Sequence, residues 1–354
     1  MKRATIILVP FLLAVLGLAT LEGGLRLAGF SREAAPVVLR FGYPNPREMV
    51  DLFRPDPRLF WRFRPGSVFD AGGKVAINAA GYRGPLPLVE RAATGRRLAV
   101  LGDSVAFGGA TAWPHELAVL LGEAWPGRQV EVLNFGVPGY TVIQGERQYT
   151  DDVRPLRPDV VILAYGWNDH WLAAGGLPDH QRSFPSPARA RLSLFLARLR
   201  LVQALNGLLP AGAGYSPAAA APARRRVPPD IFRLRLENLA RRARADGARV
   251  LVLGLPSALS AAAFPPYLVD MGFARDAESA LADHAAYRAA AAGAAQAAGA
   301  MYLDLQSVMD AARAGRTGTF FSADGIHPNA AGQEILAVAL LPVLEALVTG
   351  EEQP

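Results

Sequence analysis

The sequence predicts an α/β domain of three layers, in which a parallel β-sheet of five strands lies between two layers of helices. Five short apolar runs predict the strands, at residues 98–101, 130–133, 160–163, 250–253 and 301–303. Stretches of helical character alternate with these runs. Strands that are apolar at nearly every position are typical of a parallel sheet buried on both faces, and right-handed crossovers place helices on either side of it.

The predicted domain covers residues 96–348 of a 354-residue chain and is preceded by two further segments. Residues 31–95 are rich in Pro, Gly and Arg and contain short extended patterns at 59–63 and 74–78. They also carry too many aromatic residues for a solvated tether. We therefore expect them to form a small β-containing unit that packs on the main domain.

The first segment, residues 1–30, has the pattern of a membrane anchor. A basic head at 1–3 precedes the uncharged run 4–21, whose 18 residues, rising about 1.5 Å each, just cross a hydrocarbon core of about 30 Å. Basic residues before the run and Glu22 after it favour a cytoplasmic N-terminus with the rest of the chain exported. Residues 17–19 resemble a cleavage site, so a cleaved signal peptide is one alternative and a buried core helix another. The anchor is favoured because the apolar helical face continues beyond Glu22 without a clear polar segment.

A long insertion, residues 171–229, separates the third and fourth predicted strands. Between residues 191 and 209 its apolar residues recur at the spacing of one helical face. The simplest interpretation is a helix docked on the core; the alternatives are a lid over the site and a surface that rests on a membrane. Residues 211–229 are rich in Ala, Pro and Gly and include an arginine run at 224–226, which favours a mobile, solvated loop.

The charge and the absence of cysteine exclude several classes of function. The 37 Lys and Arg residues exceed the 31 acidic residues only slightly, and the net charge of +6 is scattered. Nucleic-acid binding needs a concentrated basic footprint, so we expect no nucleic-acid partner. Without cysteine, the chain has no disulfide, no thiolate metal site and no cysteine nucleophile.

A candidate nucleophile follows the first predicted strand, in the segment Gly102-Asp103-Ser104. In open α/β sheets the ligand crevice lies at this end of the strands. A serine at a strand-to-helix turn exposes its hydroxyl there, and the helix N-terminus favours developing negative charge. Taken alone, the tripeptide is also typical of an ordinary turn or helix cap.

Candidate donors for an oxyanion follow the second and third strands, in the segments 134–139 and 166–169. Glycine lets the backbone approach a ligand closely, so Gly139, or its rival Gly136, suits a main-chain N–H donor. The side-chain amide of Asn168 is a neutral, directional donor suited to the same task. Either segment alone also fits a turn.

A candidate base follows the last strand, where Asp324 precedes His327 by three residues. An aspartate on the same short loop can hold one ring nitrogen while the other faces Ser104, as in any Ser-His-Asp triad. By itself, this segment also fits a loop with an incidental histidine.

The remaining histidines favour structural roles. We expect His115 on a partly exposed helix and His284 inside a long helix. For His170 and Trp171, which flank the third polar segment, a place in the wall of the substrate pocket is the alternative to a structural role. The five histidines include no H-x-x-x-H pair, so we expect no metal site.

In this order, the four polar segments resemble the SGNH, or GDSL-like, family of serine esterases. The resemblance covers residues 98–347, and each motif falls at the expected strand end. It implies a flavodoxin-like α/β/α sandwich and chemistry without a cofactor. The residue after the serine is Val105 where the family's name has leucine, at a position that does no chemistry.

Carried over residue by residue, the resemblance implies a complete set of catalytic groups. Ser104 is the implied nucleophile, His327 its base and Asp324 the partner of that base. The implied oxyanion donors are the N–H groups of Ser104 and Gly139 and the amide of Asn168.

The function to expect is therefore hydrolysis of an acyl ester, on a small molecule or a glycan, by an esterase, lipase or carbohydrate deacetylase. One alternative is an O-acyltransferase that acts on an envelope polysaccharide with the same triad. Another is an inactive, envelope-binding module. The segments 1–30 and 31–95 resemble the layout of membrane-bound bacterial members. This layout implies a single-pass protein of the bacterial inner membrane, with its catalytic domain facing the periplasm or the cell exterior, or a secreted protein after signal cleavage.

Overall fold

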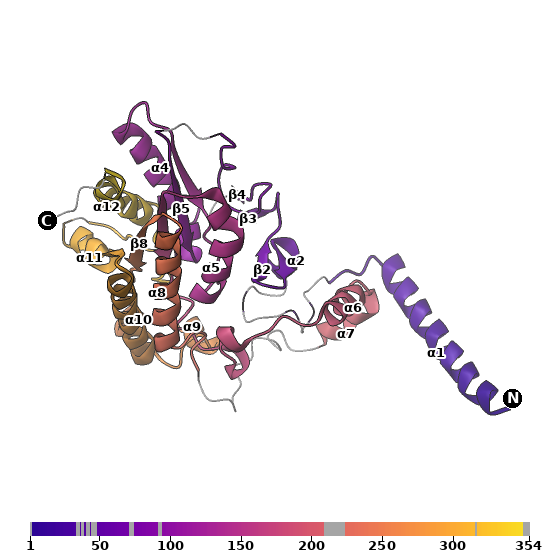
Figure 1. The fold of residues 1–354 in the computed structure, drawn as a ribbon. Coiled ribbons are helices and arrows are strands. Elements are labelled where there is room, and N and C mark those ends of the chain that lie inside the picture. Colours follow the sequence, from indigo (N-terminus) through magenta and orange to yellow (C-terminus); the bar gives the residue numbers. More distant parts are fainter. Residues whose placement is uncertain are drawn as a thin grey trace.

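A parallel sheet of five strands forms the centre of the computed structural model, which describes residues 2–32, 36, 39, 43, 48–70, 74–90, 94–208, 224–315 and 317–349 (Figure 1). The strands are β5 (Arg96–Gly102), β6 (Val130–Asn134), β7 (Val160–Ala164), β8 (Arg249–Gly254) and β9 (Met301–Asp304). They are arranged in the order β6-β5-β7-β8-β9, and all adjacent pairs are parallel. Each strand contains the apolar run that predicted it, and the predicted sheet is confirmed.

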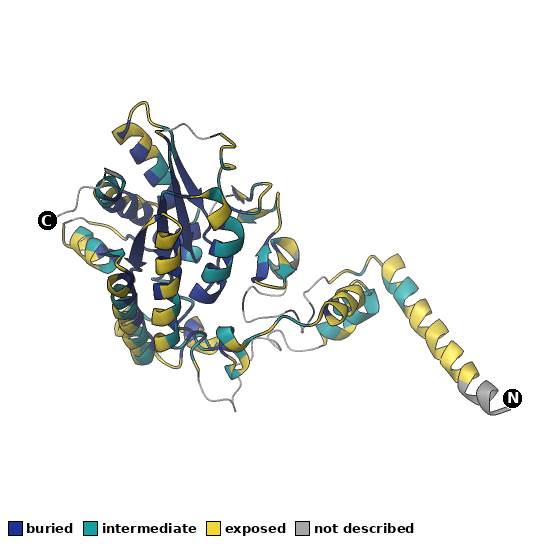
Figure 2. Ribbon diagram, viewed as in Figure 1, coloured by how far each residue is buried: buried dark blue, intermediate teal, exposed yellow. Residues whose placement is uncertain are grey.

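Helices cover both faces of the sheet. One face packs against α5 (Val142–Gln148), α8 (Pro229–Ala245) and α10 (Ala277–Ala298), the other against α4 (Trp113–Ala124), α11 (Leu305–Gly315) and α12 (Ala330–Thr349). Successive strand residues point to opposite faces. In β5, Leu101 therefore joins the first core and Val100 the second. Figure 2 shows the sheet buried between the two helical layers.

Short helical turns complete the connections. They are α3 (Ser104–Phe107), α9 (Tyr267–Asp270), a π-helical turn η2 (Tyr149–Val153) and the 3₁₀ turns η3 (Arg154–Leu156), η4 (Ala174–Gly176), η5 (Asp179–Gln181) and η6 (Ala261–Ala263).

Two antiparallel hairpins precede the sheet. After the short helix α2 (Glu48–Asp51), β1 (Phe53–Asp56) pairs with β2 (Phe60–Phe63), and β3 (Val68–Asp70) pairs with β4 (Lys74–Ala76). The hydroxyl of Tyr140 donates to the backbone oxygen of Trp61 at 2.6 Å, and the rings of Phe63 and Phe107 lie 5.2 Å apart. The hairpins thus share a buried aromatic core with the main domain.

The N-terminal helix α1 (Lys2–Leu27) projects away from the sheet (Figure 1). Its segment Leu8–Leu27 has a mean hydropathy of 1.9, and 0% of that segment is buried. A buried core helix, one of the alternatives for residues 1–30, is therefore wrong. Length and composition fit both a membrane anchor and a signal sequence. The other long apolar segment, Ala330–Val348, is partly buried and lies within the core helix α12.

In the described part of the insertion 171–229 lie the α-helices α6 (Pro187–Ala197) and α7 (Arg200–Gly207). They lie at the C-terminal end of α1 and away from the sheet (Figure 1). Ala190 and Gln203 are their buried residues. A single helix docked on the core is therefore wrong. Of the loop predicted at 211–229, residues 211–223 lie outside the described residues.

Candidate active site

Ser104 is the first residue of α3, directly after β5. The carboxylate of Asp103 caps this helix by accepting from the N–H of Val105 at 2.9 Å. Gly102 permits the sharp turn, because a Cβ there would lie 2.6 Å from the backbone oxygen of Ala164 on β7. The chain thus turns sharply after β5 and presents the Ser104 hydroxyl at the C-terminal end of the parallel strands.

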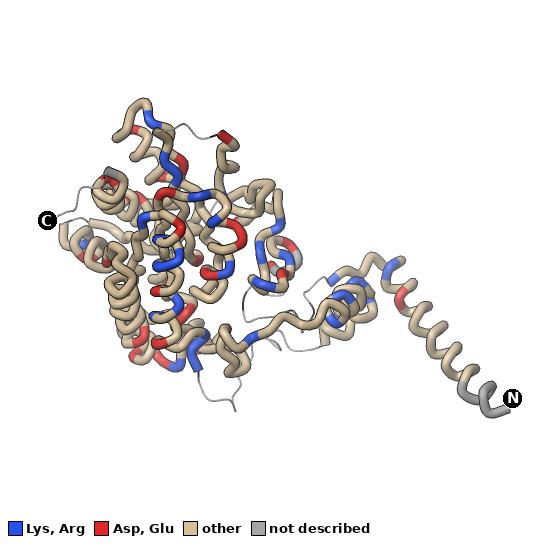
Figure 3. The backbone as a smooth tube through the Cα atoms, viewed as in Figure 1, with Lys and Arg blue, Asp and Glu red and all other residues tan. Residues whose placement is uncertain are grey.

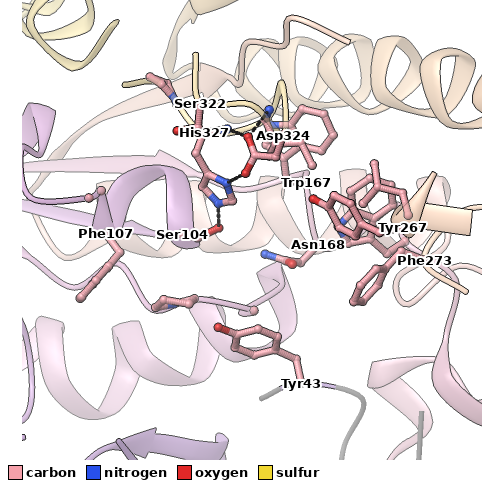
Figure 4. A pocket seen from close by; sticks show the side chains of 18 of the residues that line it. Tyr43, Ser104, Phe107, Trp167, Asn168, Tyr267, Phe273, Ser322, Asp324 and His327 are labelled. Atoms are coloured by element: carbon pink, nitrogen blue, oxygen red, sulfur yellow. Dashed lines mark hydrogen bonds and ion pairs between the residues drawn. The ribbon is translucent and has the colours of Figure 1, made fainter. Parts of the chain in front are cut away.

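A chain of hydrogen bonds connects Ser104 with the loop before α12 (Figure 4). The Nε2 atom of His327 lies 2.8 Å from the Ser104 hydroxyl, and its Nδ1 atom lies 2.5 Å from Oδ2 of Asp324. The other carboxylate oxygen of Asp324, Oδ1, accepts from the N–H groups of Ile326 and His327 at 2.9 and 3.0 Å. The structure therefore brings the three residues of the predicted triad together.

The charge of Asp324 fixes the tautomer of His327. Burial by itself raises the pKa of Asp324, but the hydrogen bond and charge of His327, together with the two backbone N–H groups, lower it below its ordinary value. An ionised carboxylate only accepts hydrogen bonds, so Nδ1 of His327 carries the proton. The Nε2 atom is then left to accept a hydrogen bond from Ser104, which is the arrangement that a general base needs.

The two glycines proposed as oxyanion donors lie in different surroundings. Gly139, at φ +82°, lines the pocket that contains Ser104, and the ring of Tyr43 packs directly on it. Gly136 instead packs under α3, where a Cβ would lie 2.5 Å from the N–H nitrogen of Phe107. Of the two, Gly139 lies where a ligand can reach it.

Asn168 lines the same pocket, and its amide nitrogen points toward Ser104 (Figure 4). This nitrogen is buried and has no hydrogen-bond partner among the described residues. The carboxylate of Asp103 is close to the amide but makes no hydrogen bond of normal geometry with it. A buried donor without a partner is costly unless a ligand accepts from it.

Two buried carboxylates support these groups from below. Asp169 accepts from the N–H of Val142 at 2.9 Å and from that of Gly166 at 3.1 Å, so it ties the turn after β7 to the start of α5. Burial raises the pKa of Asp169 to about 8 and that of Asp103 to about 7. The sequence analysis did not single out Asp169 as a supporting residue, although it directly follows Asn168 in the segment 166–169.

The pocket around Ser104 has a volume of about 410 Å³, and several aromatic side chains contribute to its walls. The aromatic side chains include Tyr43, Phe69, Trp167, Trp171, Tyr267 and Phe273. Tyr43 and Phe69 come from the segment before the sheet, which therefore forms part of the pocket wall. Sequence reasoning did not assign that segment to the site.

Arg226 also lines the pocket, and its placement corrects the prediction of a solvated loop at 224–226. Its guanidinium pairs with the buried carboxylate of Asp179, with Nη2 2.7 Å from Oδ2. Its neighbour Arg225 forms an ion pair with Asp283. Composition suggested solvent exposure, whereas two ion pairs hold this arginine run in place.

The other histidines lie outside the pocket. His115 is half-buried on α4 beside Gly84, and burial together with Arg83 lowers its pKa to about 4. Trp171 lines the pocket, but His170 is fully buried behind it. His284 stacks on Trp167 with ring centroids 4.0 Å apart, and burial lowers its pKa to about 3.

Replacing His170 with phenylalanine should make the protein less sensitive to acid. Neither ring nitrogen of His170 has a hydrogen-bond partner in another described residue, and burial holds its pKa well below 6.5. Below pH 6.5 the unfolded chain therefore binds a proton at His170 that the folded chain does not bind. This difference lowers the free energy of unfolding by up to about 1.4 kcal/mol per pH unit as the pH falls.

The variant has no histidine at position 170 and so lacks this loss. Its free energy of unfolding should therefore fall less steeply than that of the wild type as the pH falls. Urea unfolding at a series of pH values measures both. A packing change caused by the larger ring would shift the free energy of unfolding by the same amount at every pH. At pH 8, where His170 is neutral in both the folded and the unfolded chain, the difference between the two proteins measures that packing change alone. Parallel curves between pH 8 and pH 5 would contradict the assignment of a neutral, buried His170.

Comparison with known proteins gives one family. Residues 100–335 match the GDSL-like Lipase/Acylhydrolase family. Similar solved structures include a putative GDSL-like lipase from Parabacteroides merdae, with 15% identity, a TM-score of 0.46, and coverage of 74% of this chain and 99% of that one. For a lipase/acylhydrolase from Enterococcus faecalis the values are 18%, 0.46, 73% and 100%. For an acetylxylan esterase from Geobacillus stearothermophilus they are 18%, 0.45, 70% and 93%. No curated protein matches the chain.

Proposed function

Since the chain belongs to the GDSL-like lipase/acylhydrolase family, we propose that it is a serine ester hydrolase that forms an acyl-enzyme on Ser104. The observation that carries the proposal is the continuous hydrogen bonding from Ser104 through His327 to Asp324, at the wall of an aromatic pocket. Family membership supports an acylhydrolase, and the proposal adds the identity of the nucleophile and the catalytic steps.

Acylation begins at the Ser104 hydroxyl. Its oxygen attacks the ester carbonyl while Nε2 of His327 takes its proton, and Asp324 stabilises the imidazolium that forms. The same Nε2 then gives the proton to the departing alcohol. Water attacks the acyl-enzyme with His327 again acting as base, the acid is released and Ser104 regains its proton.

The tetrahedral intermediates carry a negative charge on the former carbonyl oxygen. The N–H groups of Ser104 and Gly139 and the amide of Asn168 are the donors proposed for it. The unpartnered Asn168 nitrogen supports this assignment, because a donor that is already desolvated and oriented needs no rearrangement when the charge appears.

A serine-reactive fluorophosphonate should label the protein once, at Ser104. Its phosphorus accepts the serine oxygen and the leaving fluoride departs, which mimics acylation. Ser104→Ala should abolish both the label and the turnover of p-nitrophenyl acetate and of longer-chain p-nitrophenyl esters. Ser322→Ala is the matched control, because Ser322 lines the same pocket and its hydrogen bond with His327 is made by the backbone, which the substitution keeps.

Persistent labelling of Ser104→Ala would remove Ser104 as nucleophile. A stoichiometric burst of p-nitrophenol that is followed by turnover only when a sugar alcohol is added would favour an O-acyltransferase. Absence of both label and burst in the wild-type protein would favour an inactive binding module.

We also propose that α1 anchors the hydrolase in a membrane as a single span, with the catalytic domain outside the cytoplasm. The support is the apolar segment Leu8–Leu27, none of which is buried, and the basic residues Lys2 and Arg3 before it. The quenching measurement described below tests whether this helix enters a bilayer.

A further inference from the structure

Helices α6 and α7 present apolar side chains that the described part of the chain leaves uncovered. Leu192 and Phe195 on α6 are 58% and 59% exposed, and Leu205 on α7 is 56% exposed. Leu208, directly after α7, is 82% exposed. The spacings 192–195–196 and 201–205–208 each place their members on one face of a helix. Two adjacent helices with exposed apolar faces need a partner or an apolar medium.

The charge on the same two helices is entirely positive. Residues 187–208 contain four arginines and no acidic residue. Arg189, Arg191 and Arg198 are exposed and form no ion pair within the described chain. Figure 3 shows basic but no acidic positions on the two helices. Arginines beside exposed leucines are typical of helices that lie on anionic lipid surfaces, where the guanidinium reaches the phosphates and the apolar side chains enter the acyl region.

Polar contacts fix these helices at one level of α1. The Glu22 carboxylate accepts from the N–H groups of Arg200 and Leu201, at 3.0 and 2.9 Å, and so caps the start of α7. Arg26 donates to the backbone oxygen of Arg198 at 3.3 Å, and the N–H of Arg32 donates to the side chain of Gln203 at 3.0 Å. Glu22 is the first charged residue after the uncharged run 4–21. The two helices are therefore fastened where the apolar part of α1 ends.

We propose that α6 and α7 form a lipid-binding platform on the surface of the bilayer that α1 enters. Their exposed leucines and Phe195 insert at the boundary between headgroups and acyl chains, and their arginines pair with the phosphates of anionic lipids. The proposal rests on the membrane part of the proposed function and is independent of the catalytic part. It accounts together for the exposed apolar faces, the uncompensated arginines and the attachment at Glu22.

Fluorescence quenching by lipids tests the platform, and the absence of cysteine from the chain makes single-site labelling direct. Full-length Phe195→Cys and Leu205→Cys, each carrying an NBD fluorophore, are reconstituted into vesicles of phosphatidylcholine and phosphatidylglycerol. The vesicles carry a doxyl quencher either close to the headgroup or close to the end of the acyl chain.

Two labelled positions serve as references. Val119 on α4 matches Phe195 with 59% exposure, and Figure 1 shows α4 far from α1 and α6. Leu16 lies inside the uncharged run of α1, six residues before Glu22, and is 63% exposed. Circular dichroism of each labelled variant checks that it is folded.

The platform predicts quenching at positions 195 and 205 that is several-fold stronger than at 119, and stronger from the shallow quencher than from the deep one. Position 16 should show the opposite preference. In vesicles of phosphatidylcholine alone, quenching at 195 and 205 should weaken, because the arginines lose their anionic partners.

Quenching at 195 and 205 no stronger than at 119 overturns the platform. If position 16 is then quenched, the anchor stands without it; if position 16 is not quenched either, both fail. A blue-shifted NBD emission at 195 without lipid quenching also overturns the platform, because it shows the apolar face covered by protein, for example by a second copy of the chain.

Discussion

Replacing His327 with alanine should lower kcat/KM for ester hydrolysis on the order of 10⁴- to 10⁶-fold, about as much as replacing Ser104. His327 Nε2 is the proposed proton acceptor for the Ser104 hydroxyl, 2.8 Å away. Because the members of a triad act as a unit, the Ser104→Ala/His327→Ala double variant should be no slower than either single variant. Initial rates with p-nitrophenyl acetate over a range of substrate concentrations measure the loss.

Asp324→Asn should lower kcat/KM nearly as much, because the substitution would change the tautomer of His327. The sequence alone predicts a milder loss, because backbone carbonyls can also orient a histidine. In the structure, however, Oδ1 of Asp324 accepts from two backbone N–H groups, so an asparagine would keep its amide oxygen at that position. Its NH₂ group would then face Nδ1 of His327 and place the ring proton on Nε2, which could no longer act as a base.

Folding and pH give the controls for these variants. Each should keep the circular dichroism of the wild type, because the three side chains are partly exposed at the pocket wall. The lowered pKa of Asp324 keeps it ionised throughout the usual assay range, so a fall in rate at acidic pH does not come from protonation of Asp324. Full activity of Asp324→Asn would remove Asp324 from the mechanism, and full activity of His327→Ala would remove His327 as the base.

Asn168→Ala should lower kcat by about 10²- to 10³-fold and leave KM nearly unchanged. The Asn168 amide points toward Ser104 and has no hydrogen-bond partner among the described residues, so its contribution should appear mainly when the oxyanion forms. Steady-state kinetics with a single p-nitrophenyl ester separate the two constants.

Labelling and stability distinguish this role from a structural one. Because the amide nitrogen makes no hydrogen bond in the resting structure, Asn168→Ala should unfold at the same Tm as the wild type or above it. His327 and Ser104 should remain paired, so the variant should still react with a fluorophosphonate, more slowly. A fall in Tm that accompanies the fall in kcat would contradict the oxyanion role. So would a rise in KM that accounts for the whole loss in kcat/KM.

The sheet and the polar segments could be predicted because both depend on local patterns. The apolar run 160–163 on β7 is buried on both faces of the sheet. A short run that is apolar at every position is typical of such a central parallel strand, so the run itself predicts the strand. Gly102-Asp103-Ser104 and the segment from Asp324 to His327 are short, and hydrogen bonds between near neighbours, from Val105 to Asp103 and from His327 to Asp324, shape each of them. Their residue types therefore carry most of the information about their placement.

Contacts between distant segments could not be predicted in this way. Composition placed the arginine run 224–226 in solvent, but the partner of Arg226 is Asp179, which is 47 residues away. Tyr43 packs on Gly139 although it belongs to residues 31–95, which local sequence patterns present as a separate unit. Likewise, the periodicity of residues 191–209 predicts an apolar helical face. It does not predict that Glu22 of α1 accepts a hydrogen bond from the N–H of Arg200 at the start of α7.

The proposed catalytic pair is drawn from opposite ends of the main domain, since Ser104 and His327 are separated by 223 residues. The loop that carries His327 is held in turn by α12, whose Gln333 accepts from the N–H of Trp113 at the start of α4. During synthesis, the serine therefore emerges long before its base, and the nucleophile remains unactivated until nearly the whole domain has been made and packed. A partly folded or prematurely terminated chain exposes a serine of ordinary reactivity and does not attack esters around it.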